Sequence, residues 1–258
     1  MRTFCAWAAV LLALTGCHTA EPDLTEYASG PAEVPLEILG EMDEATREAL
    51  IGEPKYVALT FDDGPRPGTT DRLLDGLLER DAAATFFVIG EQVRGNEALL
   101  RRMAAEGHQI GNHTYSHVRL LKMEKDAVVE EVHKAEVTLE AAVGKRDFWL
   151  RPPYGGIDAA RAAQIRTPMV YWSVDPQDWK LLDAGKVVEA VTGCVQPGDI
   201  ILLHDFYPTS VDAALEIVDR LQGAGYTFVT VEELFRIQGV EPQPGTLYAR
   251  PGKVRELP

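Results

Sequence analysis

Short apolar runs alternate with longer amphipathic stretches from Tyr56 to about residue 236. The runs are rich in β-branched and aromatic residues and are bounded by Gly, Pro or Asp, a pattern typical of buried strands. The seven predicted strands are 56–61, 84–89, 108–112, 147–150, 169–174, 199–204 and 226–231. Between them, residues 123–143 predict a helix, because five apolar residues recur on one face at helical spacing: Val128, Val132, Ala135, Leu139 and Ala142.

Strands that alternate with helices indicate an α/β fold with a parallel sheet and crossover helices. An open doubly wound sheet and a closed barrel both fit this order, and seven units are one short of an eight-fold barrel. We place this domain at residues 54–236. The remainder, 237–258, contains "EPQPG" and "ARPGK" and predicts an irregular tail on the surface.

The first seventeen residues predict an export signal. Arg2 supplies a positive charge, and residues 4–14 form an apolar segment too short to span a bilayer. The segment closes with "LTGC", which resembles the lipobox of bacterial lipoproteins, so we expect Cys17 to be lipidated. An ordinary cleaved signal peptide is the alternative. We predict that residues 18–53 are a tether and N-terminal segment, with a possible short helix at 43–52.

Composition narrows the possible partners. The chain has 258 residues, of which 46% are hydrophobic, enough for a large core, and its net charge is −15. This charge argues against nucleic acid and against a basic membrane-binding surface, so we expect membrane contact through the lipid anchor only. Three cysteines are present, and only Cys194 would remain free in the folded part. We therefore predict no disulfide and a buried, apolar role for Cys194.

Ionisable residues follow five of the predicted strands. In a β/α fold the carboxyl ends of the strands meet at one mouth, where active sites lie. The groups predicted to converge there are Asp62–Asp63, His113 with His117, Arg151, the segment 175–179, and His204–Asp205. Convergence of all five is stronger evidence for an active site than any one motif.

His113 and His117 are four residues apart, so on a helical turn both rings would face the same way. Together with one carboxylate they would form a three-ligand set like that of catalytic zinc sites. Capping or surface histidines are the alternative. Asp62 and Asp63 could supply the carboxylate ligand and, separately, a base for the metal's water. The hexapeptide "TFDDGP" does not say which aspartate does which.

The segment "RPPYGG" has a rigid backbone at its two prolines. Arg151 could pair with a carboxylate and keep its pKa low. Residues 154–156 would leave amide N–H groups free as oxyanion donors. We assign Trp172 to the core and Trp179 to a pocket wall.

"TFDDGP", "HTYSH", "RPPYGG", "DPQDW" and "ILLHD" occur in this order. They resemble the five motifs of the polysaccharide deacetylase family, the NodB-homology enzymes of carbohydrate esterase family 4, over residues 54–236. The resemblance implies a distorted (β/α)7 barrel and a metal-dependent hydrolase that removes acetyl groups from N-acetylglucosamine units.

The resemblance also implies roles for the motif residues. Asp62 would be the general base, held by Arg151. The metal ligands would be Asp63, His113 and His117, with zinc as the ion and cobalt or nickel as substitutes.

His204 would be the general acid, oriented by Asp178. The Tyr154 N–H would contribute to the oxyanion hole, while the Tyr154 ring, Trp179 and Leu202 would line the substrate site.

We therefore expect an exported monomer, lipid-anchored at the bacterial cell envelope, that acts on an N-acetylated polysaccharide. Peptidoglycan is favoured, and chitooligosaccharide or poly-N-acetylglucosamine remains possible. Three alternatives stay open: an O-acetyl xylan esterase of the same family, a catalytically idle carbohydrate-binding lipoprotein, and a non-haem iron oxygenase with a two-histidine, one-carboxylate site.

Overall fold

The structure is a computed structural model that describes residues 53–144 and 147–258. The predicted signal segment with Cys17, and the tether up to residue 52 with its possible helix, lie outside the described residues. Residues 55–258 form one compact unit, which contains all five motifs. Among the described residues no helix is long and apolar enough to cross a bilayer.

Strands and helices alternate through most of this unit. The strands are β1 (Lys55–Asp62), β2 (Thr85–Val88), β3 (Gln109–Asn112), β4 (Met169–Val170), β5 (Ile200–His204), β6 (Tyr226–Phe228), β7 (Leu247–Arg250) and β8 (Lys253–Val254). The α-helices are α3 (Thr69–Glu79), α4 (Glu97–Ala105), α5 (Lys125–Val143), α6 (Ala159–Ala162), α7 (Asp178–Leu181), α8 (Ala184–Thr192), α9 (Pro208–Gly223) and α10 (Val231–Ile237). Three 3₁₀ turns complete the list: η4 (Gly90–Gln92), η5 (Leu120–Lys122) and η6 (Pro153–Gly155).

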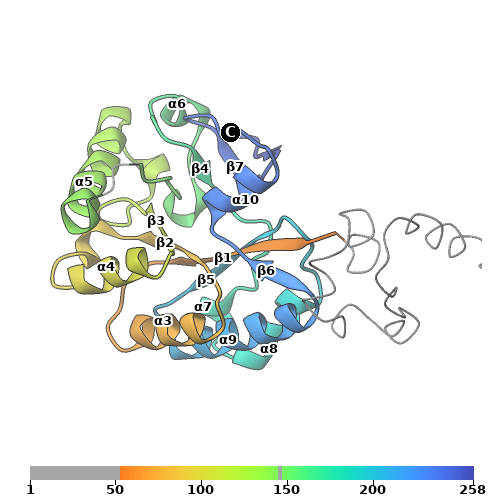
Figure 1. Cartoon of the computed structure of the whole chain (residues 1–258). Helices are drawn as coiled ribbons and strands as arrows, with labels where there is room; N and C mark the ends of the chain where they lie inside the picture. The colour runs from red at the N-terminus through yellow and green to blue at the C-terminus, as the bar shows by residue number, and fades with distance from the viewer. Residues whose placement is uncertain (1–52, 145–146) are drawn as a thin grey trace, which may run out of the picture. The chain divides into compact units, whose positions relative to one another are not determined.

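The parallel strands are arranged around β1. One path runs β3-β2-β1-β5, and β6 pairs with the first residues of β1. A second sheet, β4-β7-β8, is joined to the first by single bridges at Leu150 and Val174: Leu150 pairs with both Asn112 and Met169, and Val174 pairs with Ile201. These bridges complete the circuit of a distorted barrel, which Figure 1 shows with α3, α8 and α9 along one side.

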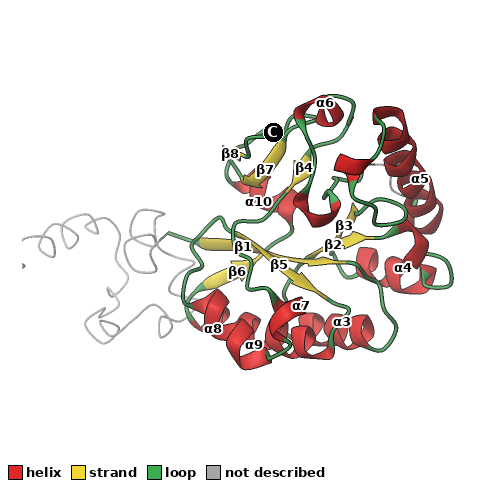
Figure 2. Cartoon of the chain, turned by 180° about the vertical axis from the view of Figure 1, so that it is seen from behind, coloured by secondary structure: helices red, strands yellow, loops and turns green. Residues whose placement is uncertain are grey.

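The two faces of β1 have different surroundings. Leu59 and Phe61 belong to the main hydrophobic cluster, which also contains buried residues of α3, α8 and α9. Figure 2 shows these helices beneath the strands. Since side chains alternate along a strand, Thr60 and Asp62 point to the opposite side. Packing of one face therefore turns polar residues of the other face toward the barrel interior.

Several sequence predictions are confirmed. The helix predicted at 123–143 is α5, and all five residues of its predicted apolar face are buried. Strands occur in six of the seven predicted segments. The segment 147–150 forms only the bridge at Leu150, and the segment 169–174 forms the short β4 and a bridge at Val174.

Two other predictions about the fold are wrong. The supposed surface tail contributes β7, whose Leu247 and Tyr248 are buried, and Tyr248 packs edge-on against Phe235 of α10. Its strand is only four residues long, too short to show a clear period. Cys194 is exposed rather than buried, because it lies just beyond the end of α8, after the capping residue Gly193.

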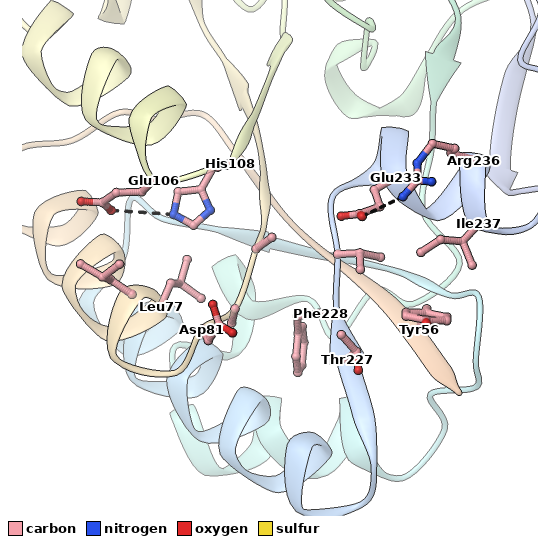
Figure 3. Close-up of a pocket in the computed structure, with 15 residues that line it drawn as sticks. Tyr56, Leu77, Asp81, Glu106, His108, Thr227, Phe228, Glu233, Arg236 and Ile237 are labelled. Carbon is pink, nitrogen blue, oxygen red and sulfur yellow. Dashed lines mark hydrogen bonds and ion pairs between the residues drawn. The ribbon is translucent and has the colours of Figure 1, made fainter. Parts of the chain in front are cut away.

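A hollow of about 450 Å³ lies at the amino ends of the strands, lined by Tyr56, Phe228 and His108 among others (Figure 3). Burial lowers the pKa of His108 to about 4, and its Nδ1 accepts a hydrogen bond from the Ala84 N–H. His108 is thus a neutral residue of the fold. The hollow is at the end of the barrel opposite to the motif residues.

Candidate metal and catalytic site

The five motifs meet at the carboxyl ends of the strands, as expected. Asp62 ends β1, His113 follows β3, and Arg151 follows the bridge at Leu150. His204 ends β5 and is the register partner of Asp62 on the neighbouring strand. Asp178 is the first residue of α7, and its side chain is hydrogen-bonded to the His204 ring.

Asp63, His113 and His117 form a compact cluster whose ligand atoms all lie within 4.8 Å of one another. Asp63 Oδ1 is 3.5 Å from His113 Nε2 and 3.2 Å from His117 Nε2. One carboxylate oxygen therefore faces both imidazoles, an arrangement that can hold a divalent cation.

The donor atoms of this cluster fit a cation. Asp63 Oδ1 is buried and has no hydrogen-bond partner among the described residues. His113 Nδ1 lies 2.7 Å from the Arg151 carbonyl oxygen, to which it can only donate, so the lone pair of Nε2 is free. Burial and the neighbouring His113 lower the pKa of His117, which keeps that ring neutral, as metal binding requires.

The two histidines are not on a helical turn, and that part of the prediction is wrong. They belong to a loop in which Thr114 and His117 have positive φ of 64° and 53°. Asn112 Oδ1 accepts a hydrogen bond of 2.7 Å from the Thr114 N–H and stabilises the loop. The rings still meet, with centroids 5.0 Å apart.

Asp62 is held by Arg151, a fully buried guanidinium. Arg151 Nη1 donates to Asp62 Oδ1 at 2.8 Å and to Thr60 Oγ1 at 2.7 Å, while Nη2 donates to the Tyr171 carbonyl. The guanidinium also lies 4.1 Å from the centre of the Phe87 ring. Burial raises the pKa of Asp62, but the charges of Arg151, His113 and His204 and the hydrogen bond from Arg151 together outweigh burial, so the pKa is lowered.

His204 has a different carboxylate partner. Its Nδ1 lies 2.9 Å from Asp178 Oδ1, and its backbone N–H donates to Asp178 Oδ2 at 2.8 Å. Ser210 Oγ, at the start of α9, donates to the same Oδ2 at 2.5 Å. Although burial lowers the pKa of His204, the Asp178 hydrogen bond and charge raise it to about 9.

The "RPPYGG" segment forms η6, and its amides do not all behave as predicted. The N–H groups of Gly155 and Gly156 bond to the carbonyls of Pro152 and Pro153. Only the Tyr154 N–H has no acceptor within the described part of the chain, and Tyr154 has a φ of 60°. The prediction of three free amides is thus wrong, but the amide implied by the family resemblance is the free one.

The predicted substrate-site residues differ in exposure. Trp179 is 48% exposed and Tyr154 is 53% exposed, whereas Leu202 is buried. Leu202 shares the inward face of β5 with His204, because the two are two residues apart on one strand. Trp172 is not part of the buried core. It is half-buried and stacks on Tyr171, with the ring centroids 3.7 Å apart.

Sequence reasoning missed Thr60 and Ser210, which hold Arg151 and Asp178 in place. Thr60 is two residues before Asp62, and strand alternation could have placed both on one face. Ser210 carries no such signal, because its contact depends on how α9 packs against α7.

The family model described as "Polysaccharide deacetylase" matches residues 51–169. The chain is 40% identical over 191 residues to the peptidoglycan-N-acetylmuramic acid deacetylase PdaC of Bacillus subtilis, covering 74% of this chain and 41% of PdaC. The fold of this chain matches a solved structure described as "T48 deacetylase with substrate". The TM-score is 0.72 and the sequence identity 42%, and the match covers 80% of this chain and 99% of the solved one.

The chain belongs to the polysaccharide deacetylase family. A family 4 acetyl xylan esterase from Clostridium thermocellum, solved with a cobalt ion, matches with a TM-score of 0.72 and 33% identity, covering 76% of this chain and 98% of the other. The chain spans about two fifths of the length of curated relatives such as PdaC. As a polysaccharide deacetylase family member it has the distorted barrel of that family, and Asp63, His113 and His117 form its candidate metal site.

Proposed function

We propose that this protein is a metal-dependent hydrolase that removes acetyl groups from N-acetylglucosamine units of a cell-envelope polysaccharide. One observation carries the proposal. The carboxyl ends of the strands bring together a three-ligand cluster, a carboxylate paired with arginine and a histidine paired with aspartate. Amide hydrolysis needs this set: a polarised carbonyl, an activated water and a proton for the leaving amine.

The two adjacent aspartates have different roles in this proposal. Asp63 is the ligand, because its Oδ1 faces both histidines. A divalent cation bound there would polarise the acetamide carbonyl and make a water more acidic. Asp62 is the general base: Arg151 holds its Oδ1 and helps to keep it ionised, while Oδ2, 3.6 Å from His113 Nε2, is the oxygen that can accept the water's proton.

His204 is the general acid. Its Nδ1 is occupied by Asp178, so Nε2–H is the group that can donate to the leaving nitrogen. The raised pKa keeps this proton on the ring at neutral pH. The Tyr154 N–H, free of other partners, can donate to the oxygen that becomes negative, and one such donor is typically worth ~3 kcal/mol.

We infer zinc as the ion, since two imidazoles and a carboxylate suit it, with cobalt or nickel as substitutes. Activity of the full-length protein should fall after chelation and return with Zn²⁺ or Co²⁺. Full activity after thorough removal of metal would refute the mechanism. Asp62→Asn should abolish turnover but leave metal bound; loss of metal instead would mean that the two aspartates have exchanged roles.

Peptidoglycan is the proposed substrate, supported by the activity in PdaC's name and by the predicted signal and lipid anchor at Cys17, which would bring the enzyme to the cell envelope. The Tyr154 ring, Trp179 and Leu202 would line the substrate site. The deciding experiment measures acetate release by the full-length protein from peptidoglycan, chitooligosaccharides and acetylated xylan. Release from xylan alone would favour the esterase alternative, and no release from any would favour an idle carbohydrate-binding protein.

A further inference from the structure

Three side chains form a stack that leads outward from the metal cluster. The Tyr154 ring lies against the His117 ring, with centroids 4.8 Å apart. On the Tyr154 ring, the Arg119 guanidinium lies 3.9 Å from the centroid. An exposed positive charge is thus one aromatic ring away from a candidate metal ligand.

The backbone around Arg119 is well anchored. The next residue, Leu120, is fully buried, and the Arg119 carbonyl accepts a hydrogen bond of 2.9 Å from the Lys122 N–H. Leu121 lies against the "RPPYGG" loop, because a Cβ added to Gly156 would be 3.3 Å from Leu121 Cδ1. The position of Arg119 therefore follows from packing and not from a flexible loop.

The guanidinium of Arg119 has no acidic partner in the described part of the chain, and none of its N–H groups donates a hydrogen bond there. Several arginines pair with acids, for example Arg102 with Asp75 and Arg220 with Glu189, whereas Arg119 belongs to the group that does not. Arg119 is the member of that group that lies on the Tyr154 ring, beside the metal cluster. Because its flat face covers Tyr154, its N–H edges are the groups available to a ligand.

We propose that Arg119 is a specificity-determining residue that binds a carboxylate on the glycan, next to the sugar that is deacetylated. This rests on the proposed function and narrows its substrate class to acidic glycans, such as strands whose muramic acid units carry a lactyl carboxylate. Neutral chitin-type chains offer no anion to this arginine. Stacking on Tyr154 favours this use, because it orients the planar fork that matches a carboxylate.

The preference that Arg119 gives for the carboxylate-bearing glycan should be modest, since Arg119 is exposed to solvent. Exposed ion pairs are weak and screened by salt, so we expect a preference of about 1.5- to 5-fold that shrinks as ionic strength rises.

The experiment compares one glycan in two charge states. Peptide-free strands of alternating N-acetylglucosamine and N-acetylmuramic acid are used as such, and after conversion of their carboxylates to amides. The full-length variants are Arg119→Gln, Arg119→Lys, and Arg236→Gln as a control. Arg236 is an exposed arginine beside the hollow of Figure 3, at the opposite end of the barrel from the candidate site. Arg236→Gln therefore removes the same positive charge as Arg119→Gln but at a remote place. The readouts are kcat/KM for acetate release and, separately, equilibrium binding.

The wild type and Arg236→Gln should prefer the carboxylate form, and Arg119→Gln should treat both forms alike. Arg119→Lys should keep part of the preference, because it keeps the charge. Two results would overturn the inference. One is a wild type with the same kcat/KM and affinity for the carboxylate and amide forms; the other is an Arg119→Gln variant in which kcat/KM falls by the same factor on both forms. Discrimination in binding with no acetate released would leave the inference standing and reject the proposed function.

Discussion

The hydrogen bond between His204 and Asp178 gives the most direct test of the proposed chemistry. Burial alone would lower the pKa of His204, yet Asp178, with smaller contributions from the charges of Asp62 and Asp63, raises it from 6.5 to about 9. At ~1.4 kcal/mol for each pKa unit, Asp178 and its neighbours favour the imidazolium by about 3 kcal/mol in net terms. A cation at Asp63 would oppose part of this, so the alkaline limit of activity lies at or below pH 9.

Asp178→Asn removes the charge while nearly keeping the shape. With burial offset only by the charges of Asp62 and Asp63, the pKa of His204 should fall to about 6.5. At pH 8 only about 3% of an imidazole with that pKa remains protonated. The variant should therefore lose about 10- to 30-fold in kcat/KM at pH 8, and much less at pH 6.

The assay is the pH profile of kcat/KM for acetate release, with an NMR titration of the His204 ring in both proteins. Ser210→Ala is the matched variant: it removes one donor to Asp178 Oδ2 but keeps the carboxylate's charge, so its profile should move much less. If the Asp178→Asn profile coincides with that of the wild type, or its ring still titrates near 9, the assignment of Asp178 as the source of the raised pKa is wrong.

The same pair predicts a change in stability. His204 binds protons more tightly in the folded state, so its contribution is fully present below pH 6.5 and is lost as pH rises toward 9. The free energy of unfolding of the wild type should fall over this range more steeply than that of Asp178→Asn, which denaturant titrations at several pH values would show.

Three further predictions follow from buried contacts. Arg151→Met leaves Asp62 buried without its cation, and should cost about 3–5 kcal/mol in denaturant unfolding; a loss below 1 kcal/mol would contradict this. Gly64→Ala would place a Cβ 2.3 Å from Asp205 Oδ1 and should destabilise by about 1–3 kcal/mol, whereas Gly223→Ala, with open space, should not. Burial raises the pKa of Asp205 to about 7, so wild-type stability should decline from pH 4 to pH 7, and an Asp205→Asn variant should lack that decline.

The features that follow from local pattern were predictable from the sequence. The buried face of α5 follows from helical spacing, and β1, β2, β3 and β5 follow from short apolar runs between turn residues. The convergence of the motifs followed from a rule about parallel strands and needed no coordinates.

The features that depend on tertiary packing were not predictable. The loop of His113 and His117 reaches the right ring placement through two left-handed residues, which no spacing rule indicates. The burial of β7 depends on its contact with α10 and on pairing with β4, which lies far from it in sequence. The distinction between Asp62 and Asp63 needed the family resemblance, and the structure supplies a physical reason in the placement of Arg151.

Left-handed backbone at residues other than glycine is concentrated around the candidate site. Asp63, Thr114, His117, Tyr154 and Gln177 all have positive φ, against only two such residues elsewhere in the described chain, Asp81 and Leu182, and Leu182 ends the helix that carries Asp178. Each such residue costs free energy that glycine would save. A design procedure that optimises stability alone would therefore replace two of the proposed metal ligands and the proposed oxyanion donor residue. Thermostable variants of this protein should be sought elsewhere in the barrel, with these positions excluded from change.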